Sequence, residues 1–459
     1  MDDIETIPGP RDLLAANNSG ELRRFCESEH AAIVADRLAE LNEEEVWGII
    51  KTTKPERQAE IVSHLPIALQ SRLILSLQRS DAGLLLVEMP PDDRAGLFRQ
   101  LDEEQRERIY PSIATAERED IRRLTAHPAD SAGSVMSSDY VALERSMTVA
   151  EALHQIRLEA PEKEIVYYVY VLDKARRLIG LVSLKNLIIA KENSTIEELM
   201  RSDFVTAHVT DDKETAARKI QKFDLIALPV VNDENVLVGI ITHDDALDVI
   251  TQEQQEDLEK LMAISGSHDV GTYLQTPALV HFKNRAYWVV GLAALGLVSG
   301  LIIHSFEDSL AQLMILALYM PMVADTGGNT GSQSATVVVR GLALGEIRPR
   351  DIFRVLFKEL RVSLLLALVL AVLSFGKVLF LSHGADIPPG FTIERIASVI
   401  ALSLGMQVVT ATLIGAWLPM IASKFKLDPA VVASPALTTI VDITGLLLYF
   451  TAAKMMLGI

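Results

Sequence analysis

The chain has 459 residues, of which 49% are hydrophobic, and it carries a formal net charge of −18. This acidity argues against nucleic acid as a partner, because phosphate binding requires clustered positive charge. The charge is uneven, since residues 1–275 contain 51 acids and 30 bases, whereas residues 276–459 contain 10 acids and 13 bases. A single cysteine, Cys26, excludes an intrachain disulfide framework and suits a reducing cytosol. The polar start of the sequence lacks the features of a signal peptide, so we expect the acidic half to be cytoplasmic.

The first expected domain, residues 1–130, contains a twelve-residue period. Several of the repeating positions are followed by prolines or acids, which favour the first turn of a helix. Short helices at a fixed period predict an all-α superhelical domain of paired helices. An ordinary amphipathic bundle is the alternative. The repeating positions are Leu41, Thr53, Leu65, Leu77, Met89 and Leu101.

Two further expected domains, residues 131–193 and 194–250, are approximate copies of one another. Residues 135–156 align with 199–220, and each copy predicts the order strand, helix, strand, strand, helix. A glycine lies inside a buried apolar strand in both copies, in IGLVS and VGIIT. The pattern resembles a tandem pair of cystathionine-β-synthase (CBS) domains. That resemblance implies α/β regulatory modules that pair face to face and often bind adenosyl ligands or ions.

Residues 251–280 form the expected connection to the membrane half, and we interpret them as an acidic plug helix. A helical sequence rich in acids begins just before this segment, at Asp244, and continues to Glu259. Such a run is usually a solvated helix face. Between sensor-like domains and membrane spans, however, crowded carboxylates would repel one another until divalent cations bridged them. The segment would then be a two-state element that a metal can bias.

Residues 281–459 contain apolar runs of bilayer length and predict an α-helical membrane domain with five transmembrane helices. Basic residues gather before the first span and in the connections after the second and fourth spans, whereas the opposite connections are acidic or neutral. The positive-inside rule therefore places the N-terminus in the cytoplasm and the C-terminus on the outer face. The expected spans are 286–306, 310–330, 355–381, 395–422 and 430–456.

Two features of these spans are unsuited to an inert anchor. The segment 321–347 places glycines and small polar residues at membrane depth, where irregular backbone is tolerated only beside protein or a water-filled cavity. Close helix packing through small residues is the alternative. Asp442 lies inside the fifth span, where a carboxylate costs about 2.5–3.5 kcal/mol, so it is a functional candidate. A protonated packing residue is the other interpretation. Thr438 and Thr439 share its helix face and could offer hydroxyls to a hydrated cation.

The order of all these segments resembles the MgtE family of magnesium channels over nearly the full chain. The most specific motifs are GGNTGSQSAT (327–336), the following Arg340, and PALTTIVDITGLLLY (435–449). The resemblance implies a homodimer, surrounded by lipid in a bacterial inner membrane, that takes up Mg²⁺ through a pore lined by spans 2 and 5. It also implies closure of the pore when intracellular Mg²⁺ fills acidic sites in the cytosolic domains.

The resemblance assigns individual residues as well. Asp442 would bind the hydrated ion in the pore, helped by carbonyls near Gly327, Gly328 and Thr438, and Asn329 would line the same path. The family binds ATP at its CBS pair, and this is left open here because no phosphate-cradling glycine loop supports it. The implied cytosolic sensing acids are Asp92 or Asp93, Asp245, Asp248, Glu253 and Asp428.

The sequence departs from the family pattern at two places near the pore. Ser434 stands where at least some relatives have Asn, which puts the finer selectivity against Co²⁺, Mn²⁺ or Ca²⁺ in doubt. Asp325 stands where a small residue can occur, and it adds negative charge near the pore.

Two other functions compete with a channel. A transporter that exchanges another divalent metal, such as Co²⁺, for protons would require Asp442 to change its protonation during the cycle. An enzyme is disfavoured, because the sequence has no Walker motif, no His/Cys metal cluster and no nucleophile elbow.

Overall fold

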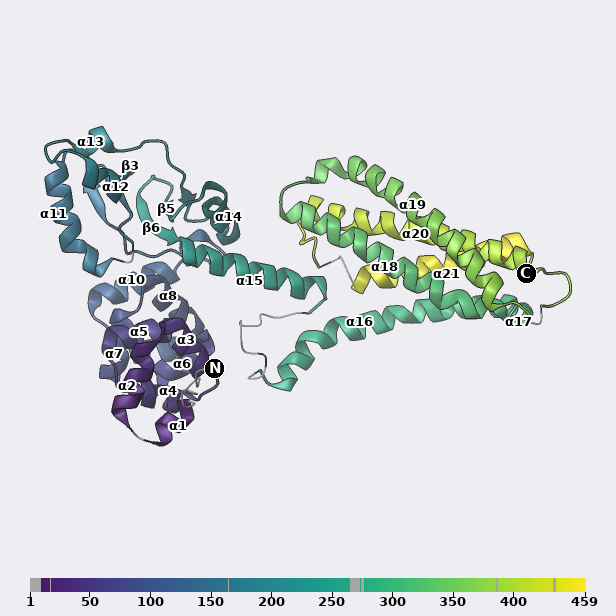
Figure 1. Cartoon of the computed structure of the whole chain (residues 1–459), viewed down its shortest axis with the longest axis horizontal. Coiled ribbons are helices and arrows are strands. Elements are labelled where there is room, and N and C mark those ends of the chain that lie inside the picture. Colours follow the sequence, from purple (N-terminus) through teal and green to yellow (C-terminus); the bar gives the residue numbers. More distant parts are fainter. Residues whose placement is uncertain are drawn as a thin grey trace, which may run out of the picture. The chain divides into compact units, whose positions relative to one another are not determined.

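The computed structural model describes residues 10–16, 18–163, 165–264, 273, 276–384, 387–431 and 435–459. The chain divides into two compact units, of which the first ends at Glu253 within a long helix. The second unit begins with the rest of that helix and takes in the residues from Thr276 to the C-terminus. Figure 1 shows the elements of both units.

The N-terminal domain is built from short helices, as the twelve-residue period predicts. Helices α4 to α9 begin at residues 43, 55, 67, 79, 91 and 103, so each start is twelve residues after the last. The six repeating positions directly precede the N-cap residues. Five of them are buried, and Leu77 is partly buried against the same core. Asn42 and Asp102 form capping boxes, and Pro55 and Pro91 open α5 and α8. The helices are α1 (Pro10–Ala15), α2 (Ser19–Ser28), α3 (Ala31–Leu38), α4 (Glu43–Ile50), α5 (Pro55–Ser63), α6 (Ile67–Ser76), α7 (Arg79–Glu88), α8 (Pro91–Gln100), α9 (Glu103–Ile109) and α10 (Thr115–Thr125).

The duplicated segment folds into two copies of one α/β unit. Each copy has a three-stranded sheet in which the first strand pairs parallel and the last strand antiparallel to the middle one. Both antiparallel pairs also shift register at the same place in the repeat. The first copy contains β1 (Ala142–Glu144), α11 (Val149–Glu159), β2 (Tyr168–Leu172), β3 (Leu178–Ser183), α12 (Leu184–Ile189) and α13 (Ile196–Leu199). The second contains β4 (Ala207–His208), α14 (Lys213–Phe223), β5 (Ala227–Val231), β6 (Leu237–Thr242) and the start of α15 (His243–Leu261).

The two copies pack face to face through a shared apolar cluster that includes Tyr170 and Ile240. The glycine in each buried strand admits a neighbouring backbone. A Cβ at Gly180 would lie 3.2 Å from the carbonyl oxygen of Arg201, and one at Gly239 would lie 2.8 Å from that of Ser137. The sequence motif with the buried glycine is therefore a packing requirement of the pair.

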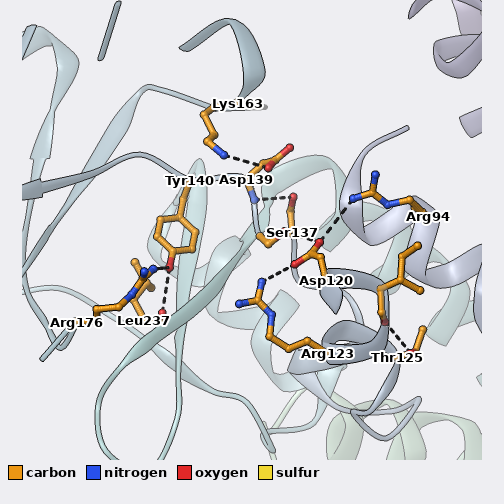
Figure 2. A network of polar contacts seen from close by, with 12 residues as sticks. Arg94, Asp120, Arg123, Thr125, Ser137, Asp139, Tyr140, Lys163, Arg176 and Leu237 are labelled. Carbon is orange, nitrogen blue, oxygen red and sulfur yellow. Dashed lines mark hydrogen bonds and ion pairs between the residues drawn. The ribbon is translucent and has the colours of Figure 1, made fainter. Parts of the chain in front are cut away.

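A polar network joins the N-terminal helices to the first copy (Figure 2). Asp120 of α10 accepts from Arg123 at 2.6 Å and lies 3.6 Å from Arg94 of α8, and the Ser138 hydroxyl donates to it at 2.9 Å. Further along the network, Lys163 pairs with Asp139 at 3.3 Å. Arg94 is only 5% exposed, so the network is shielded from water at this end, whereas the Arg123 side chain is half exposed.

The second unit is dominated by five long helices: α16 (Ala278–Ser305), α18 (Ile315–Ala343), α19 (Ile352–Leu381), α20 (Ile393–Lys424) and α21 (Pro435–Leu457). A short helix, α17 (Glu307–Gln312), precedes α18. Four segments are long and apolar enough to cross a membrane: 278–305, 349–381, 393–424 and 435–457. The remaining long helix, α18, carries the small polar residues singled out in the sequence.

The segment 321–347 differs from the expectation of irregular backbone. Most of it belongs to α18, which is one continuous helix of 29 residues. Gly327, Gly328 and Gly331 lie against α20 or α21, where the small size of glycine is needed. Helix α20 is buried over most of its length and lies at the centre of this packing.

Candidate functional site

A cavity of about 350 Å³ lies between α18 and α21. Asp442 and Thr438 border it from α21, as their i,i+4 spacing predicts. Thr439 does not border it, and its hydroxyl instead donates to the carbonyl of Pro435, 3.2 Å away. The residues that α18 contributes recur at helical spacing and are Pro321, Ala324, Asp325, Gly328, Asn329 and Ser332. The cavity thus gathers two carboxylates, an amide and two hydroxyls.

The two helices that form the cavity run antiparallel. The Tyr449 hydroxyl donates to the carbonyl of Leu316 at 2.9 Å, near the start of α18 and the end of α21. Further along α18, a Cβ at Gly328 would meet the Thr438 methyl at 3.2 Å. The missing side chain at Gly328 therefore lets α21 approach the lining of the cavity.

Gly327 lies on another face of α18 and does not border the cavity. A Cβ at Gly327 would come 2.3 Å from Nε2 of Gln407 in α20, and one at Gly415 would come 2.2 Å from the carbonyl oxygen of Gly331. The irregular backbone expected in this segment is not found, because Gly327 and Gly328 lie within the continuous helix α18. The assignment of carbonyls near them to the ion stays a prediction. The alternative, close packing of helices through small residues, describes the segment.

Gln407 was missed at the sequence level and is fully buried. Its Nε2 donates to the carbonyl of Val441, 2.8 Å away and next to Asp442 in the chain. It also fills the space beside Gly327 and Gly445, so one side chain joins α18, α20 and α21. A lone amide within the apolar sequence of α20 is the signal that could have identified it.

A second missed contact joins α18 to α19. The Ser334 hydroxyl donates to Glu359 at 2.9 Å, and Ser334 is 4% exposed. In the sequence Glu359 lies among basic residues at the start of α19, where a carboxylate suggests only a surface charge. The contact ties α18 to α19.

A cluster of carboxylates lies in the first unit, where α8 meets α15. Asp93 belongs to the first turn of α8, and Asp245 and Asp248 are one turn apart on α15. Burial, with repulsion from Asp248 and Asp244, raises the pKa of Asp93 to about 6. Burial, with repulsion from Asp244 and Asp93, likewise raises the pKa of Asp245 to about 6, although a hydrogen bond with Thr242 opposes the shift. Asp248 has a raised pKa for the same reasons, burial first. We call these four residues, Asp93, Asp244, Asp245 and Asp248, the α8–α15 acid cluster.

The other expected sensing acids have different surroundings. Asp92 is the neighbour of Asp93 in the chain and is half-buried. Glu253 pairs with Lys213 of α14 at 3.2 Å. Asp428, in the connection between α20 and α21, pairs with Lys260 near the end of α15 at 2.9 Å. Glu253 and Asp428 therefore already have ammonium partners and do not join the α8–α15 acid cluster.

Neither candidate region is a preformed metal cage. Within the described parts of the chain, no three His, Cys, Asp or Glu side chains are grouped closely enough to hold a metal ion. Ser434, the departure noted in the sequence, lies outside the described residues. The cavity can accept a cation with its water shell, whereas the acid cluster stores repulsion that a bridging cation would relieve.

Family comparisons agree with a transport site in the second unit. Residues 320–452 match the family model described as a divalent cation transporter, a range that contains every residue bordering the cavity. Residues 29–130 match the MgtE intracellular N domain, and residues 132–193 and 196–252 match CBS domains. The protein is therefore a divalent cation transporter built into a membrane, and not an enzyme.

Curated relatives identify the family. The chain is 34% identical to the magnesium transporter MgtE of Thermus thermophilus over 97% of both chains. It is 35% identical to the magnesium transporter MgtE of Bacillus subtilis over 86% of this chain and 84% of that protein. The chain belongs to the MgtE family of magnesium transporters.

A solved structure resembles the N-terminal helical domain and the CBS pair. This neighbour is the cytosolic domain of the Mg²⁺ channel MgtE in complex with ATP, with 32% identity and a TM-score of 0.50. The match covers 52% of this chain and 98% of that one. The helical domain and the CBS pair expected from the sequence are thus confirmed as a fold.

Proposed function

We propose that two copies of this chain form a Mg²⁺-selective channel that takes up magnesium and closes when intracellular Mg²⁺ binds the cytosolic acids. The cavity that Asp442 shares with Asn329 and Thr438 carries the proposal, since it offers oxygen atoms to a cation between two membrane helices. Mg²⁺ dehydrates reluctantly and is usually held by one or two carboxylates with several waters. An inside-negative potential supplies about 4.6 kcal/mol per divalent ion at 100 mV, so uptake needs no ATPase.

The assembly and orientation are part of the same proposal. Apolar side chains on α16 and α19 are largely exposed. Only 6% of the most apolar stretch of residues 278–305 is buried, and only 17% of that of residues 349–381. We assign these surfaces to lipid and to the second copy, with α18 and α21 of both copies lining the pore. The distribution of basic residues places the N-terminus in the cytoplasm and the C-terminus on the outer face of a bacterial inner membrane.

The α8–α15 acid cluster is the proposed sensor. Four acids, including the half-buried Asp93 and Asp245, repel one another across two helices, and a divalent cation would turn that repulsion into attraction. At the end of α15, Leu261 packs against an apolar cluster that contains Val441, the residue before Asp442 in the chain. This contact supports a link between α15 and the pore. Asp92, Glu253 and Asp428 remain proposed sensing acids through the family resemblance. Glu253 and Asp428 would first have to leave their lysine partners.

ATP binding at the CBS pair is a separate proposal. It rests on the solved relative that contains ATP and on the matching fold of residues 132–193 and 196–252. Titration of the full-length protein with ATP by calorimetry tests it, and heat no larger than that of a buffer control would contradict it.

The decisive test of the channel is Mg²⁺ flux into liposomes that contain the full-length protein. We expect flux that scales with membrane voltage, persists without a pH gradient, and falls as Mg²⁺ on the cytosolic side rises. Flux that vanishes when the pH gradient is removed would instead support an exchanger of metal for protons. Flux that ignores cytosolic Mg²⁺ would contradict the sensor.

A further inference from the structure

The cavity contains a second carboxylate that the family resemblance does not account for. Asp325 of α18 and Asp442 of α21 border the same space of about 350 Å³. A carboxylate within a membrane helix costs free energy, so such residues mark ion pathways. Among the described residues, neither Asp325 nor Asp442 has a Lys, Arg or His nitrogen within the 4.0 Å of an ion pair. Two negative charges therefore face one cavity from two helices.

The two carboxylates also lie at the same level along the axes of α18 and α21. Gly328 and Thr438 mark where α18 and α21 touch. Asp325 is three residues before Gly328, and Asp442 is four residues after Thr438. Because the helices run antiparallel, both steps lead in the same direction from the contact, by about one helical turn each. The chain thus places Asp325 opposite Asp442 across the cavity.

We propose that Asp325 and Asp442 of one chain together bind a single hydrated Mg²⁺, and that Asp325 sets the affinity and the preference for divalent ions. This inference rests on the proposed pore. Two carboxylates match the charge of one divalent cation, whereas a monovalent cation leaves the cavity with an excess negative charge. Asp325 is therefore a specificity-determining residue whose loss weakens ion binding while the Asp442 position is retained.

The size of the cavity favours an ion that keeps its water. A Mg²⁺ ion with about six waters, at about 30 Å³ each, occupies about 180 Å³, well within the cavity. Direct coordination would require oxygen atoms at about 2.0–2.1 Å in octahedral geometry. Asn329, Ser332 and Thr438 supply amide and hydroxyl groups that can hydrogen-bond the outer surface of the water shell.

The test uses the full-length protein in liposomes and the variant Asp325→Asn, which removes the charge but keeps the size. We expect about a tenfold rise in the half-saturating Mg²⁺ concentration, equivalent to about 1.4 kcal/mol. The Mg²⁺ concentration that half-blocks a Na⁺ current through the protein should rise by a similar factor. Asp325→Glu, which keeps the charge, should stay within about threefold of the wild type. Asp308→Asn, an exposed acid of α17, is the matched control and should change neither quantity.

Other outcomes separate this inference from the proposed pore. Asp325→Asn could keep the wild-type half-saturating Mg²⁺ concentration and the wild-type block by Mg²⁺ while Asp442→Asn is inactive. That result would overturn the role of Asp325 and leave the pore assignment intact. Undiminished flux in Asp442→Asn would overturn the pore assignment itself. If Asp325→Asn does not fold, as judged by size-exclusion chromatography, Asp325→Ser replaces it, and unchanged Mg²⁺ affinity in that variant also contradicts the inference.

Discussion

The cavity and the α8–α15 acid cluster both gather carboxylates, yet the two regions treat negative charge in different ways. In the cavity, Asp325 and Asp442 face a space large enough for a hydrated ion. In the cluster, the half-buried Asp93 and Asp245 lie close to other acids, and both have pKa values raised to about 6. A site that must release its ion needs room and water. A site that must change conformation on binding needs repulsion that the ion relieves.

The largest expected effect is at the cavity, where Asp442→Asn should reduce Mg²⁺ flux by more than about 100-fold. The variant removes the carboxylate but keeps the size of the side chain, so the fold and the response of the cytosolic unit to Mg²⁺ should persist. Liposome flux measures the first effect and protease protection of the cytosolic half measures the second. A parallel loss of both would mean that Asp442 is structural, and the contrast between the two regions would fail.

The next effect concerns the packing that holds the cavity. Gly415→Ala should destabilise the second unit by about 3 kcal/mol, because its Cβ would come 2.2 Å from the carbonyl oxygen of Gly331. Gly376→Ala in α19 is the matched control, since no described atom lies within 4 Å of its added Cβ. Thermal unfolding in detergent measures both variants. Equal melting temperatures would show that the helices separate easily and do not fix the cavity.

A smaller effect is expected from pH at the acid cluster. The folded-state pKa values of Asp93 and Asp245 lie near 6, above their ordinary values, so protonation stabilises the contact between α8 and α15. Without Mg²⁺, the protonated carboxyl groups contribute about 2 kcal/mol to the free energy of unfolding. This contribution is fully present below about pH 4 and is lost as the pH rises through 6.

Protease protection without Mg²⁺ should therefore be stronger at pH 5 than at pH 7.5, and saturating Mg²⁺ should reduce the difference. The double variant Asp93→Asn/Asp245→Asn is the control and should respond much less to pH. Protection that increases with pH in the wild type would contradict the proposed repulsion.

The smallest effect is expected at the end of α15. Lys260 pairs with Asp428 at 2.9 Å and with Glu256 at 2.7 Å, and all three side chains are partly exposed, so the pairs are worth only about 0.5–1 kcal/mol. Lys260→Gln should lower the cytosolic Mg²⁺ concentration that half-closes the pore by about two- to threefold, because Asp428 no longer has to leave an ammonium partner, and Lys260→Arg should not. Flux measured against cytosolic Mg²⁺ decides between them, and no shift in either variant would remove Lys260 from the gating contact.

The sequence predicts the regular parts of this molecule well, because their signals are local. The twelve-residue period identifies buried positions before each helix, and the duplication predicts two equal sheets with a glycine at the same place. The i,i+4 spacing of Thr438 and Asp442 likewise predicts one shared helix face.

The errors arise where distant segments decide the outcome. The glycines and small polar residues of α18 suggest irregular backbone, but the helix is continuous, and Gly327 lies against Gln407 of α20. Glu253 and Asp428 look like free acids in the sequence, because Lys213 and Lys260 lie 40 and 168 residues away from them. Such ion pairs depend on tertiary packing and have no local signal.

The twelve-residue spacing of helix starts has a consequence for how this family of sensors can vary. Each helix begins from an equivalent buried position, so removing or adding a helix pair preserves the spacing of the remaining caps and the core. Such a change would displace α8, and with it Asp93, by a whole structural unit relative to the start of the chain. The length of the domain could therefore change in evolution by whole helix pairs, without a change in the residues of the acidic contact at α8.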